Sequence, residues 1–566
     1  MSLSLRTSVG VDFGSESARA VLVDVATGRE LGSAVSLFAH GVIEDHLPDG
    51  GTPLPPDWAL QDPDDYVASM GAAIQEALRT SGVDAGSIVG VGIDFTACTM
   101  LPTLADGTPL CRVPELRSEP HAWVKLWKHH AAQPEADRIN ALAAERGEPW
   151  LPRYGGRTSS EWFLAKSLQI LDEAPAIYAA ADRLIEAADW IVWQLTGVET
   201  RNSCTAGYKA AWSRRDGFPD AGFLGALDSR FADLIDSRMS RDVRAIGERA
   251  GEITAEAARW TGLRAGTPVA IANVDAHVSV PAVGVTTPGQ LVAVMGTSTC
   301  HLALSADEVV VRGACGVVED GIIPGLFGHE AGQASVGDLF GWWVRTIAGD
   351  RNDGLGALHA ELEREASALR PGQTGLVALD WWNGNRSILV DAELTGMLLG
   401  ATLSTRPAEV YRSLLEATVF GTRVIIEALE GAGVPIEGIV ACGGLPFQNR
   451  LLMQLTADIT GRTVRVSASR QAPALGSAMF GAVAAGSSGG GYDTITDAAA
   501  RMAHLGPDVY QPAATDRVAW DEGYAIYREL HDSMAAQGSP MRRLRALQDR
   551  ARSSGRPPVS TAGGVR

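Results

Sequence analysis

The sequence lacks the features that mark a membrane protein, a disulfide framework or a nucleic-acid-binding protein. Its 566 residues contain no run of eighteen apolar residues, so no membrane span is expected. The N-terminus leads straight into a strand-like segment without the apolar core and cleavage site of a signal peptide, and the cysteines described next predict a cytoplasmic protein. Six cysteines lie scattered without CxxC or Cys/His ligand spacing, and this predicts reduced thiols and no structural zinc. The formal charge of −19 disfavours nucleic acid as a partner, because such binding rests on neutralising phosphates with Lys and Arg.

Two common nucleotide-binding motifs are also absent. No GxxxxGK[ST] loop occurs, and no GxGxxG follows the first predicted strand, so P-loop and dinucleotide-binding proteins are disfavoured. What is present is an ordinary globular composition, with 46% hydrophobic and 20% charged residues. The length predicts about two to four domains.

Two short apolar runs near the middle of the chain, 268–274 and 291–295, are predicted as buried strands. The first leads to Asp275, and the second ends in the turn 296–298, Gly-Thr-Ser. Ligand-contacting groups of open α/β sheets lie at strand ends, so the carboxylate and the turn are expected close together. That pairing suits phosphoryl transfer, which needs a base for an attacking hydroxyl beside N–H groups that hold a phosphate. From this stretch alone, a cap or turn role for Asp275 remains the alternative.

The N-terminal segment has the same design. Three strand-like runs form a predicted meander over residues 7–13, 19–25 and 31–37. Its first turn carries Asp12, Gly14 and Ser15. Residues 291–304 repeat the order of strand, Gly-Thr-Ser turn and strand. Two such units predict two similar domains that face one another, with chance repetition of a common turn as the alternative.

Local signals predict further elements along the chain. Asp62-Pro63 begins an amphipathic helix over 64–80, and a strand over 88–95 leads to Thr96. The segment 120–200 is predicted to be helical with most of its tryptophans in the core, and 201–216 to be a polar loop. The second half is predicted to contain a helix over 407–430 with Thr405 as N-cap, a strand over 436–442, a helix over 450–460, a strand over 463–468 and a helix over 474–485. The end of the arginine-rich last segment is predicted to be disordered.

Three glycine-containing turns follow predicted strands, at 12–17, 295–299 and 442–449, and each can direct N–H groups at phosphate oxygens. Asp12 and Asp275 add the carboxylates that a nucleotide site needs. One of them can hold hydrated Mg²⁺, and the other can accept a proton from an alcohol. Ordinary tight turns remain the alternative for the glycines.

In combination, these motifs resemble those of the FGGY carbohydrate kinases over about residues 8 to 510. The matching motifs are Val9-Gly-Val-Asp-Phe-Gly-Ser-Glu-Ser17, Asn273-Val-Asp-Ala-His277, Met295-Gly-Thr-Ser298 and Gly443-Gly-Leu-Pro-Phe-Gln-Asn449. The resemblance implies an α/β fold of two actin-like (ribonuclease H-like) ATPase domains with a catalytic cleft between them. It also implies an N-terminal domain over 1–286 with the sugar site, the first phosphate loop and the catalytic Asp. An ATP-binding domain over 287–510 and a C-terminal helix with an arginine-rich tail over 511–566 would follow.

Longer and less common strings look most like the ribulokinase branch of this family. They are Asp94-Phe-Thr-Ala-Cys-Thr-Met100, Trp123-Val-Lys-Leu-Trp-Lys-His-His130, Asn202-Ser-Cys-Thr-Ala-Gly-Tyr-Lys-Ala210, Gly328-His-Glu-Ala-Gly-Gln333 and Asp380-Trp-Trp-Asn-Gly-Asn-Arg-Ser387. This resemblance implies transfer of the γ-phosphate of ATP to the terminal 5-hydroxyl of L-ribulose in L-arabinose catabolism, with other ketopentoses or pentitols also accepted. ATP and Mg²⁺ are the implied cofactors, and the implied partners are the sugar and ATP, with neither nucleic acid nor membrane. A homodimer is left open.

The family pattern assigns roles residue by residue. Asp275 would be the general base and a substrate contact, and Asp12 would lie on the Mg²⁺–ATP side. The implied ATP-binding residues are Gly14, Ser15, Gly296, Thr297, Gly443, Gly444 and Asn449. The implied ketopentose contacts are Thr96, Ala97, Lys209 and Glu330. Without the resemblance, a solvated loop lysine and a surface carboxylate are the simpler interpretations of Lys209 and Glu330.

Three other functions remain to be separated from this one. A xylulose or ribitol kinase of the same family would differ in its preferred sugar. An actin-like or chaperone-like ATPase would hydrolyse ATP without sugar when a protein partner binds, but it has no evident need for the polar strings at 96–99, 202–209 and 328–333. A sugar-binding pseudokinase is disfavoured because Asp12 and Asp275 are both present.

Overall fold

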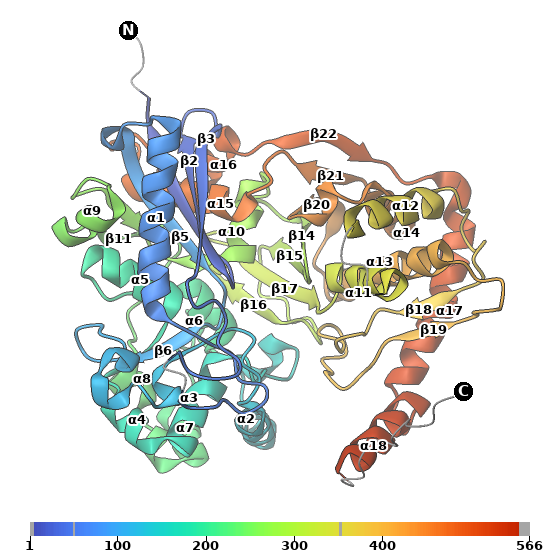
Figure 1. The fold of residues 1–566 in the computed structure, drawn as a ribbon, viewed down its shortest axis with the longest axis horizontal. Helices are drawn as coiled ribbons and strands as arrows, with labels where there is room; N and C mark the ends of the chain where they lie inside the picture. Colours follow the sequence, from blue (N-terminus) through green and yellow to red (C-terminus); the bar gives the residue numbers. More distant parts are fainter. Residues whose placement is uncertain (1–4, 49–50, 350–353, 554–566) are drawn as a thin grey trace, which may run out of the picture.

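The computed structural model describes residues 5–48, 51–349 and 354–553. It contains two seven-stranded mixed sheets with helices between them and on their outer faces (Figure 1). The first sheet consists, in order, of β11 (Arg249–Glu252), β12 (Pro268–Ala270), β5 (Ile88–Phe95), β1 (Thr7–Phe13), β2 (Ser17–Asp24) and β3 (Glu30–Leu37), with β13 (Asn273–Val274) paired to β5. The second consists of β16 (Gly316–Glu319), β17 (Phe327–Gln333), β15 (Thr299–Ser305), β14 (Gly289–Met295), β20 (Ile436–Cys442), β21 (Val464–Ser467) and β22 (Leu505–Tyr510).

The two sheets share one local topology. β1 pairs antiparallel with β2 and parallel with β5, and β14 pairs antiparallel with β15 and parallel with β20. The predicted repeat of strand, turn and strand is therefore present in the structure. The predicted strand over 268–274 is divided in two, because β12 ends at Ala270 and β13 begins at Asn273.

Two helices, α10 (Asp275–Ala282) and α15 (Ala472–Ala485), pack against each other between the sheets. α15 crosses β1 and β5 so closely that a Cβ atom on Gly10 would lie 1.8 Å from the carbonyl oxygen of Ala474. A Cβ atom on Gly92 would lie 1.9 Å from the carbonyl oxygen of Ser477. Only glycine permits this approach of two backbones. The close packing brings Ser477 to the carboxyl end of β5.

Helix α1 (Pro63–Ser81) covers the opposite face of the first sheet. Val9, Val11 and Phe13, which alternate with Gly10, belong to the same apolar cluster as Tyr66 and Ile74 of this helix. As predicted, Asp62 caps the helix, and its Oδ1 accepts a hydrogen bond of 2.9 Å from the backbone N–H of Asp64.

The outer helices of the second sheet are α11 (Gly337–Ala348), α12 (Leu355–Ser367), α13 (Pro407–Ala432) and α14 (Arg450–Thr460). The predicted N-cap of α13, Thr405, is wrong by one residue, because Arg406 occupies the cap position. The Glu409 carboxylate accepts from the Arg406 N–H at 2.8 Å, whereas the Thr405 hydroxyl accepts from the Thr402 N–H at 2.8 Å. A charged side chain three residues into the helix thus replaces the expected hydroxyl cap.

A helical lobe adjoins the carboxyl end of the first sheet (Figure 1). It contains a small sheet of β4 (Leu60–Gln61), β7 (Val124–Lys125), β6 (Met100–Thr103) and β8 (Arg183–Glu186). Its helices are α2 (Gln133–Arg146), α3 (Phe163–Glu173), α4 (Pro175–Ala180), α6 (Ser203–Lys209), α7 (Ala221–Leu227) and α8 (Leu234–Arg238), whereas α5 (Ala187–Thr196) packs against β5, β11 and β12 of the first sheet. The tryptophans Trp123, Trp150 and Trp162 are buried in the lobe, as predicted, and Trp190 and Trp193 of α5 are buried against the first sheet.

The prediction of a polar loop over 201–216 is wrong, because residues 203–209 form the buried helix α6. Asn202 caps this helix, with its Oδ1 accepting from the Thr205 N–H at 2.7 Å. The Asn202 side-chain amide in turn donates to Asp189 at 2.8 Å. The polar residues of this segment are thus hydrogen-bonded within the protein instead of to solvent, which the composition alone does not reveal.

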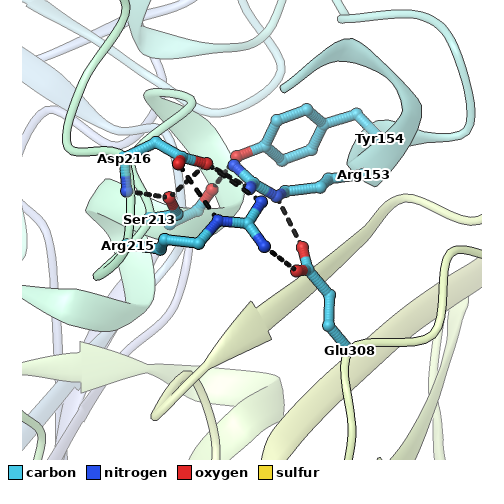
Figure 2. A network of polar contacts seen from close by, with 7 residues as sticks. Arg153, Tyr154, Ser213, Arg215, Asp216 and Glu308 are labelled. Carbon is cyan, nitrogen blue, oxygen red and sulfur yellow. Dashed lines mark hydrogen bonds and ion pairs between the residues drawn. The ribbon is translucent and has the colours of Figure 1, made fainter. Parts of the chain in front are cut away.

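Ion pairs join the helical lobe to the second sheet (Figure 2). Buried Arg153 donates from Nε to Glu308 at 2.6 Å and from its guanidinium to Asp216. Arg215 donates to the other oxygen of Glu308 at 3.3 Å. Glu308 follows β15, so these contacts hold the lobe against the second sheet. The Tyr208 hydroxyl adds a hydrogen bond of 2.7 Å to the carbonyl of Gly328 in β17.

Shorter elements and the C-terminal helices follow from the same chain. They are α9 (Ala255–Thr261), the pair β9 (Arg201–Asn202) and β10 (Val243–Arg244), the pair β18 (Val377–Leu379) and β19 (Met397–Leu399), α16 (Ile495–Met502), α17 (Arg517–Ala535) and α18 (Pro540–Ser553). The arginine-rich segment is helical as far as α18 extends, and its predicted disordered end lies outside the described residues. Within the described ranges, none of the helices combines the length and apolar character that crossing a bilayer requires.

Candidate active site

Three carboxylates lie together at the carboxyl ends of β1, β5 and β13. Asp12 and Asp94 are opposite each other in the parallel register of β1 and β5, and burial and then the negative charge of Asp12 raise the pKa of Asp94. Asp275 begins α10 directly after β13, whose Asn273 is paired with Asp94. The structure therefore brings Asp12 and Asp275, which lie far apart in the sequence, to one edge of the first sheet.

The environment of these carboxylates favours their neutral forms. Burial, and then the negative charges of Asp12 and Glu330, raise the pKa of Asp275 to about 7, although the Ala276 N–H and Lys209 oppose this. Burial and the charge of Asp12 hold the pKa of Asp94 well above its ordinary value. A carboxylate with a pKa near neutrality is suited to accept a proton from an alcohol.

A buried ion cluster lies beside Asp275. Lys209, at the end of α6, places Nζ at 3.0 Å from Oε2 of Glu330 in β17, and Arg386 donates to Oε1 of the same carboxylate at 2.8 Å. His277 Nε2 lies 3.5 Å from Glu330 Oε2. Burial would raise the pKa of Glu330, but the charges of Lys209, Arg386 and His277 outweigh it and lower the pKa to about 2. The cluster thus offers ionised donors and one ionised acceptor, which can pair with the hydroxyl and carbonyl groups of a sugar.

The other two predicted sugar contacts lie in the turn between β5 and β6. The Thr96 and Thr99 hydroxyls are 2.8 Å apart and share a hydrogen bond. Ala97 is partly buried in this turn and packs against the apolar core of the helical lobe. The adjacent Cys98 belongs to the apolar core of the helical lobe, and burial raises the pKa of its thiol to about 12, so the thiol is uncharged at neutral pH.

Each of the two predicted phosphate turns is closed by a backbone hydrogen bond. The Gly14 N–H donates to the Ser17 carbonyl at 3.0 Å, and the Gly296 N–H donates to the Ser298 carbonyl at 2.8 Å. The Ser15 hydroxyl accepts a hydrogen bond of 2.9 Å from Nε1 of Trp127, an exposed tryptophan of the helical lobe. The first turn is thus fixed partly by its own backbone and partly by a side chain of the lobe.

A cavity of about 640 Å³ adjoins the second phosphate turn, a volume within the usual range for small-molecule sites. Its lining includes Gly296, Thr297, Gly337, His359, Tyr411, Gly444 and Asn449. Four predicted ATP-binding residues therefore lie around one cavity. Gly443 has a positive φ of 90°, and a Cβ atom there would lie 2.4 Å from the Met295 carbonyl oxygen. Glycine at this position therefore allows the 443–444 backbone to pack against the residue that precedes the Gly296 turn.

The Asn449 side chain is already engaged at both ends. Its Oδ1 caps α14 by accepting from the Leu452 N–H at 2.8 Å, and its Nδ2 donates to the Tyr411 hydroxyl at 3.0 Å. One amide hydrogen remains for a bound ligand. Asn449 therefore positions the start of α14 at the cavity in addition to any contact it makes with a nucleotide.

The residues around Asp12 fit a hydrated Mg²⁺ ion. Oδ1 of Asp94 is buried without a hydrogen-bond partner among the residues the structure describes, and Asp12 beside it is partly exposed. The described chain contains no cluster of three or more His, Cys, Asp or Glu side chains that would bind a metal alone. Mg²⁺ characteristically takes one or two carboxylates and completes its shell with water and substrate phosphates, so this donor set is sufficient.

Sequence reasoning missed several polar residues of this site. Asp94 had a usable signal, because Gly92-Ile-Asp-Phe95 repeats the pattern Gly10-Val-Asp-Phe13 on a neighbouring strand. Ser477, whose hydroxyl donates to Asp94 at 2.6 Å, had none, since it lies 383 residues away. Arg386 and Trp127 lie within strings that suggested the family, but no local pattern shows that they reach Glu330 and Ser15.

Comparison with known proteins agrees with this geometry. Residues 7–282 match the N-terminal domain of the FGGY family of carbohydrate kinases, and residues 291–485 match its C-terminal domain. The chain belongs to this family. It is a two-domain α/β sugar kinase that uses ATP as a substrate.

Similar proteins include ribulokinases from several bacteria. One from Halalkalibacterium halodurans is 52% identical over 553 residues, which cover 96% of this chain and 98% of that protein. One from Mycolicibacterium smegmatis is 49% identical over 552 residues, with 96% of each chain covered. Among solved structures, a xylulose kinase from Rhodospirillum rubrum has a TM-score of 0.78 at 22% identity and covers 94% of this chain and 99% of its own. At that identity, the structural match establishes the fold alone.

Proposed function

We propose that this FGGY kinase is a ribulokinase, which transfers the γ-phosphoryl group of ATP to the terminal 5-hydroxyl of L-ribulose to form L-ribulose 5-phosphate. The observation that carries the proposal is the similarity to curated ribulokinases, which are 49 to 52% identical over almost the whole chain. The ion cluster of Lys209, Arg386 and Glu330 beside Asp275 supports it, because it supplies donors and an acceptor for a polyhydroxylated substrate.

In this mechanism Asp275 accepts the proton of the 5-hydroxyl as the oxygen attacks the γ-phosphorus of ATP. Lys209 and Arg386 donate hydrogen bonds to sugar oxygens and Glu330 accepts from a sugar hydroxyl, with Thr96 and Ala97 at the edge of the site. These contacts orient the terminal hydroxyl, and orientation contributes most of the catalysis in phosphoryl transfer. Closure of the two domains would exclude water, which competes with the sugar as a nucleophile.

On the nucleotide side, the N–H groups of the turns at Gly14–Ser15 and Gly296–Thr297 contact the phosphates, and the cavity beside Gly443, Gly444 and Asn449 receives adenosine. Asp12 and Asp94 would hold Mg²⁺, which neutralises charge on the phosphates when bound. We assign residues 1–286 to the sugar-binding domain, 287–510 to the ATP-binding domain and 511–566 to a C-terminal extension.

We place the enzyme in the cytoplasm, in L-arabinose catabolism. We also propose a homodimer, which light scattering of the purified chain tests directly through the measured mass.

A substrate panel tests the proposal. The purified chain is assayed with Mg²⁺–ATP and L-ribulose, D-ribulose, L-xylulose, D-xylulose or ribitol, and ADP release is coupled to a spectroscopic signal. We expect kcat/KM to be highest for L-ribulose, with ADP release dependent on sugar. A clear preference for a xylulose would instead assign a xylulose kinase, and ADP release that no sugar stimulates would contradict a sugar kinase.

A further inference from the structure

A buried lysine outside the ion cluster contacts the backbone of the sugar site. Lys166, in α3, is fully buried, and its Nζ donates to the carbonyl of Cys98 at 2.7 Å and to that of Leu126 at 2.6 Å. Cys98 lies in the turn between β5 and β6, and Leu126 directly follows β7. The Lys166 side chain thus connects the turn at Cys98 to the segment at Leu126, two non-strand segments that are separated in the sequence.

Both segments carry residues that face the proposed substrates. The turn that contains Cys98 also carries Thr96 and Ala97. The segment after Leu126 carries Trp127, whose indole reaches Ser15 of the first phosphate turn. The start of α3 lies at the same site, because the Lys209 Nζ is 5.5 Å from the ring centre of Trp162, the residue that precedes α3.

The turn at Cys98 needs support from outside. Cys98 has a φ of 62°, a left-handed conformation that is unfavourable for a residue other than glycine. Such a conformation persists only where surrounding structure fixes it. The Lys166 hydrogen bond to the Cys98 carbonyl fixes the peptide plane at this residue.

We propose that Lys166 is a positioning residue of the sugar site, which holds the 96–99 turn and the segment 126–127 in the geometry that binds the ketose. This inference rests on the proposed function. It does not depend on the charge of Lys166, because a neutral amine still has two N–H donors, one for each carbonyl. Burial lowers the pKa of Lys166 to about 8, so both forms occur near neutral pH.

The chain provides a matched control in Lys125. This lysine is also fully buried in the helical lobe, beside Leu126 in sequence, but its Nζ has no hydrogen-bond partner among the described residues. It lies 4.2 Å from the ring centre of Trp58 instead. Lys125→Met therefore removes a buried amine of the same kind without removing a backbone hydrogen bond.

The test compares Lys166→Met, Lys166→Gln and Lys125→Met in the coupled assay with L-ribulose and Mg²⁺–ATP. We expect Lys166→Met to raise the KM for L-ribulose about tenfold or more and the KM for ATP by clearly less, because the 96–99 turn carries two proposed sugar contacts, whereas segment 126–127 reaches the phosphate turn only through Trp127. Lys166→Gln keeps an amide donor and should lie between Lys166→Met and the wild type. Lys125→Met should resemble the wild type in both constants.

Thermal shifts provide a second readout. L-ribulose should raise the Tm of Lys166→Met less than that of the wild type, and the corresponding deficit with ATP should be clearly smaller. Equal losses on the sugar and ATP sides, loss of soluble protein in both Lys166 variants, or an unchanged KM for L-ribulose would overturn the inference. A wild-type chain that phosphorylates no ketopentose would refute the proposed function instead, so the two failures are distinguishable.

Discussion

Replacing Asp275 by Asn should stabilise the folded protein at neutral pH even though it removes the proposed base. The folded pKa of Asp275 is raised from its ordinary value of 3.8 to about 7. A group with a raised folded pKa contributes stability that is fully present below its unfolded pKa and is lost as pH rises through the folded pKa. The wild type should therefore lose this contribution between about pH 4 and pH 7, and Asp275→Asn should not.

The structure also sets the size of the effect. A pKa change from 3.8 to about 7 corresponds to roughly 4 kcal/mol, at about 1.36 kcal/mol per pH unit. The Asp275 side chain is partly exposed to solvent, although many atoms surround it. Solvent screening therefore reduces the free-energy difference below this value. We therefore expect a gain of roughly 1–3 kcal/mol in the free energy of unfolding above pH 7. The amide oxygen of Asn can still accept from the Ala276 N–H, which Asp275 Oδ1 accepts from at 2.6 Å.

The assay is urea or thermal unfolding of the ligand-free protein at several pH values between 5 and 8. The stability difference between Asp275→Asn and the wild type should grow with pH and level off above about 7. Asp307→Asn, at an exposed carboxylate, is the control and should change stability by less than about 0.5 kcal/mol. A difference that does not grow with pH, or an Asn variant less stable than the wild type at pH 8, would refute the reasoning.

Three further predictions follow from the site. Glu330→Gln should cost about 3–5 kcal/mol of stability and raise the KM for L-ribulose, because it leaves the buried ammonium of Lys209 without its anionic partner and also removes the partner of the partly exposed Arg386. Glu76→Gln, which breaks an exposed pair with Arg79, should cost much less in the same unfolding assay. The pH profile of kcat/KM should fall about tenfold per pH unit below about pH 7, since protonated Asp275 cannot accept the hydroxyl proton, and a flat profile down to pH 5 would contradict this. Tyr411→Phe removes the hydroxyl that accepts a hydrogen bond from the Asn449 side-chain amide. In steady-state kinetics it should raise the KM for ATP about three- to tenfold and leave the KM for L-ribulose unchanged. Equal changes in the two KM values would contradict the separation of the ATP and sugar sites.

Elements with strong local signals were predictable from the sequence. The strand at Ile88–Phe95, the strand at Ile436–Cys442 and the helix at Arg450–Thr460 have the predicted bounds. The Asp62 cap of α1 also follows from residue types alone, because capping depends on neighbours within three positions. Thr405 does not cap α13, because Arg406 occupies the cap position and its N–H donates to the Glu409 carboxylate.

Features that depend on contacts between distant segments were not predictable. The glycines at positions 10 and 92 are visible in the sequence, but glycine is needed there because the backbone of α15 packs against them. That helix lies almost 400 residues or more further along the chain. α6 seemed polar because its partners, including Asp189 and Gly328, lie elsewhere in the chain. The hydrogen bonds of Lys166 to two carbonyls belong to the same class. Periodicity and spacing give local structure, whereas the site is completed by long-range packing.

The most direct test of the central claim, that Asp275 is the base that activates the sugar hydroxyl, is the turnover of Asp275→Asn with L-ribulose and Mg²⁺–ATP, measured together with L-ribulose binding by calorimetry. We expect a loss in kcat of roughly 10²- to 10⁴-fold with a Kd for L-ribulose within a few-fold of the wild type. A kcat within tenfold of the wild type would contradict the base role of Asp275. A loss of activity that is fully explained by weaker binding of L-ribulose would contradict it as well.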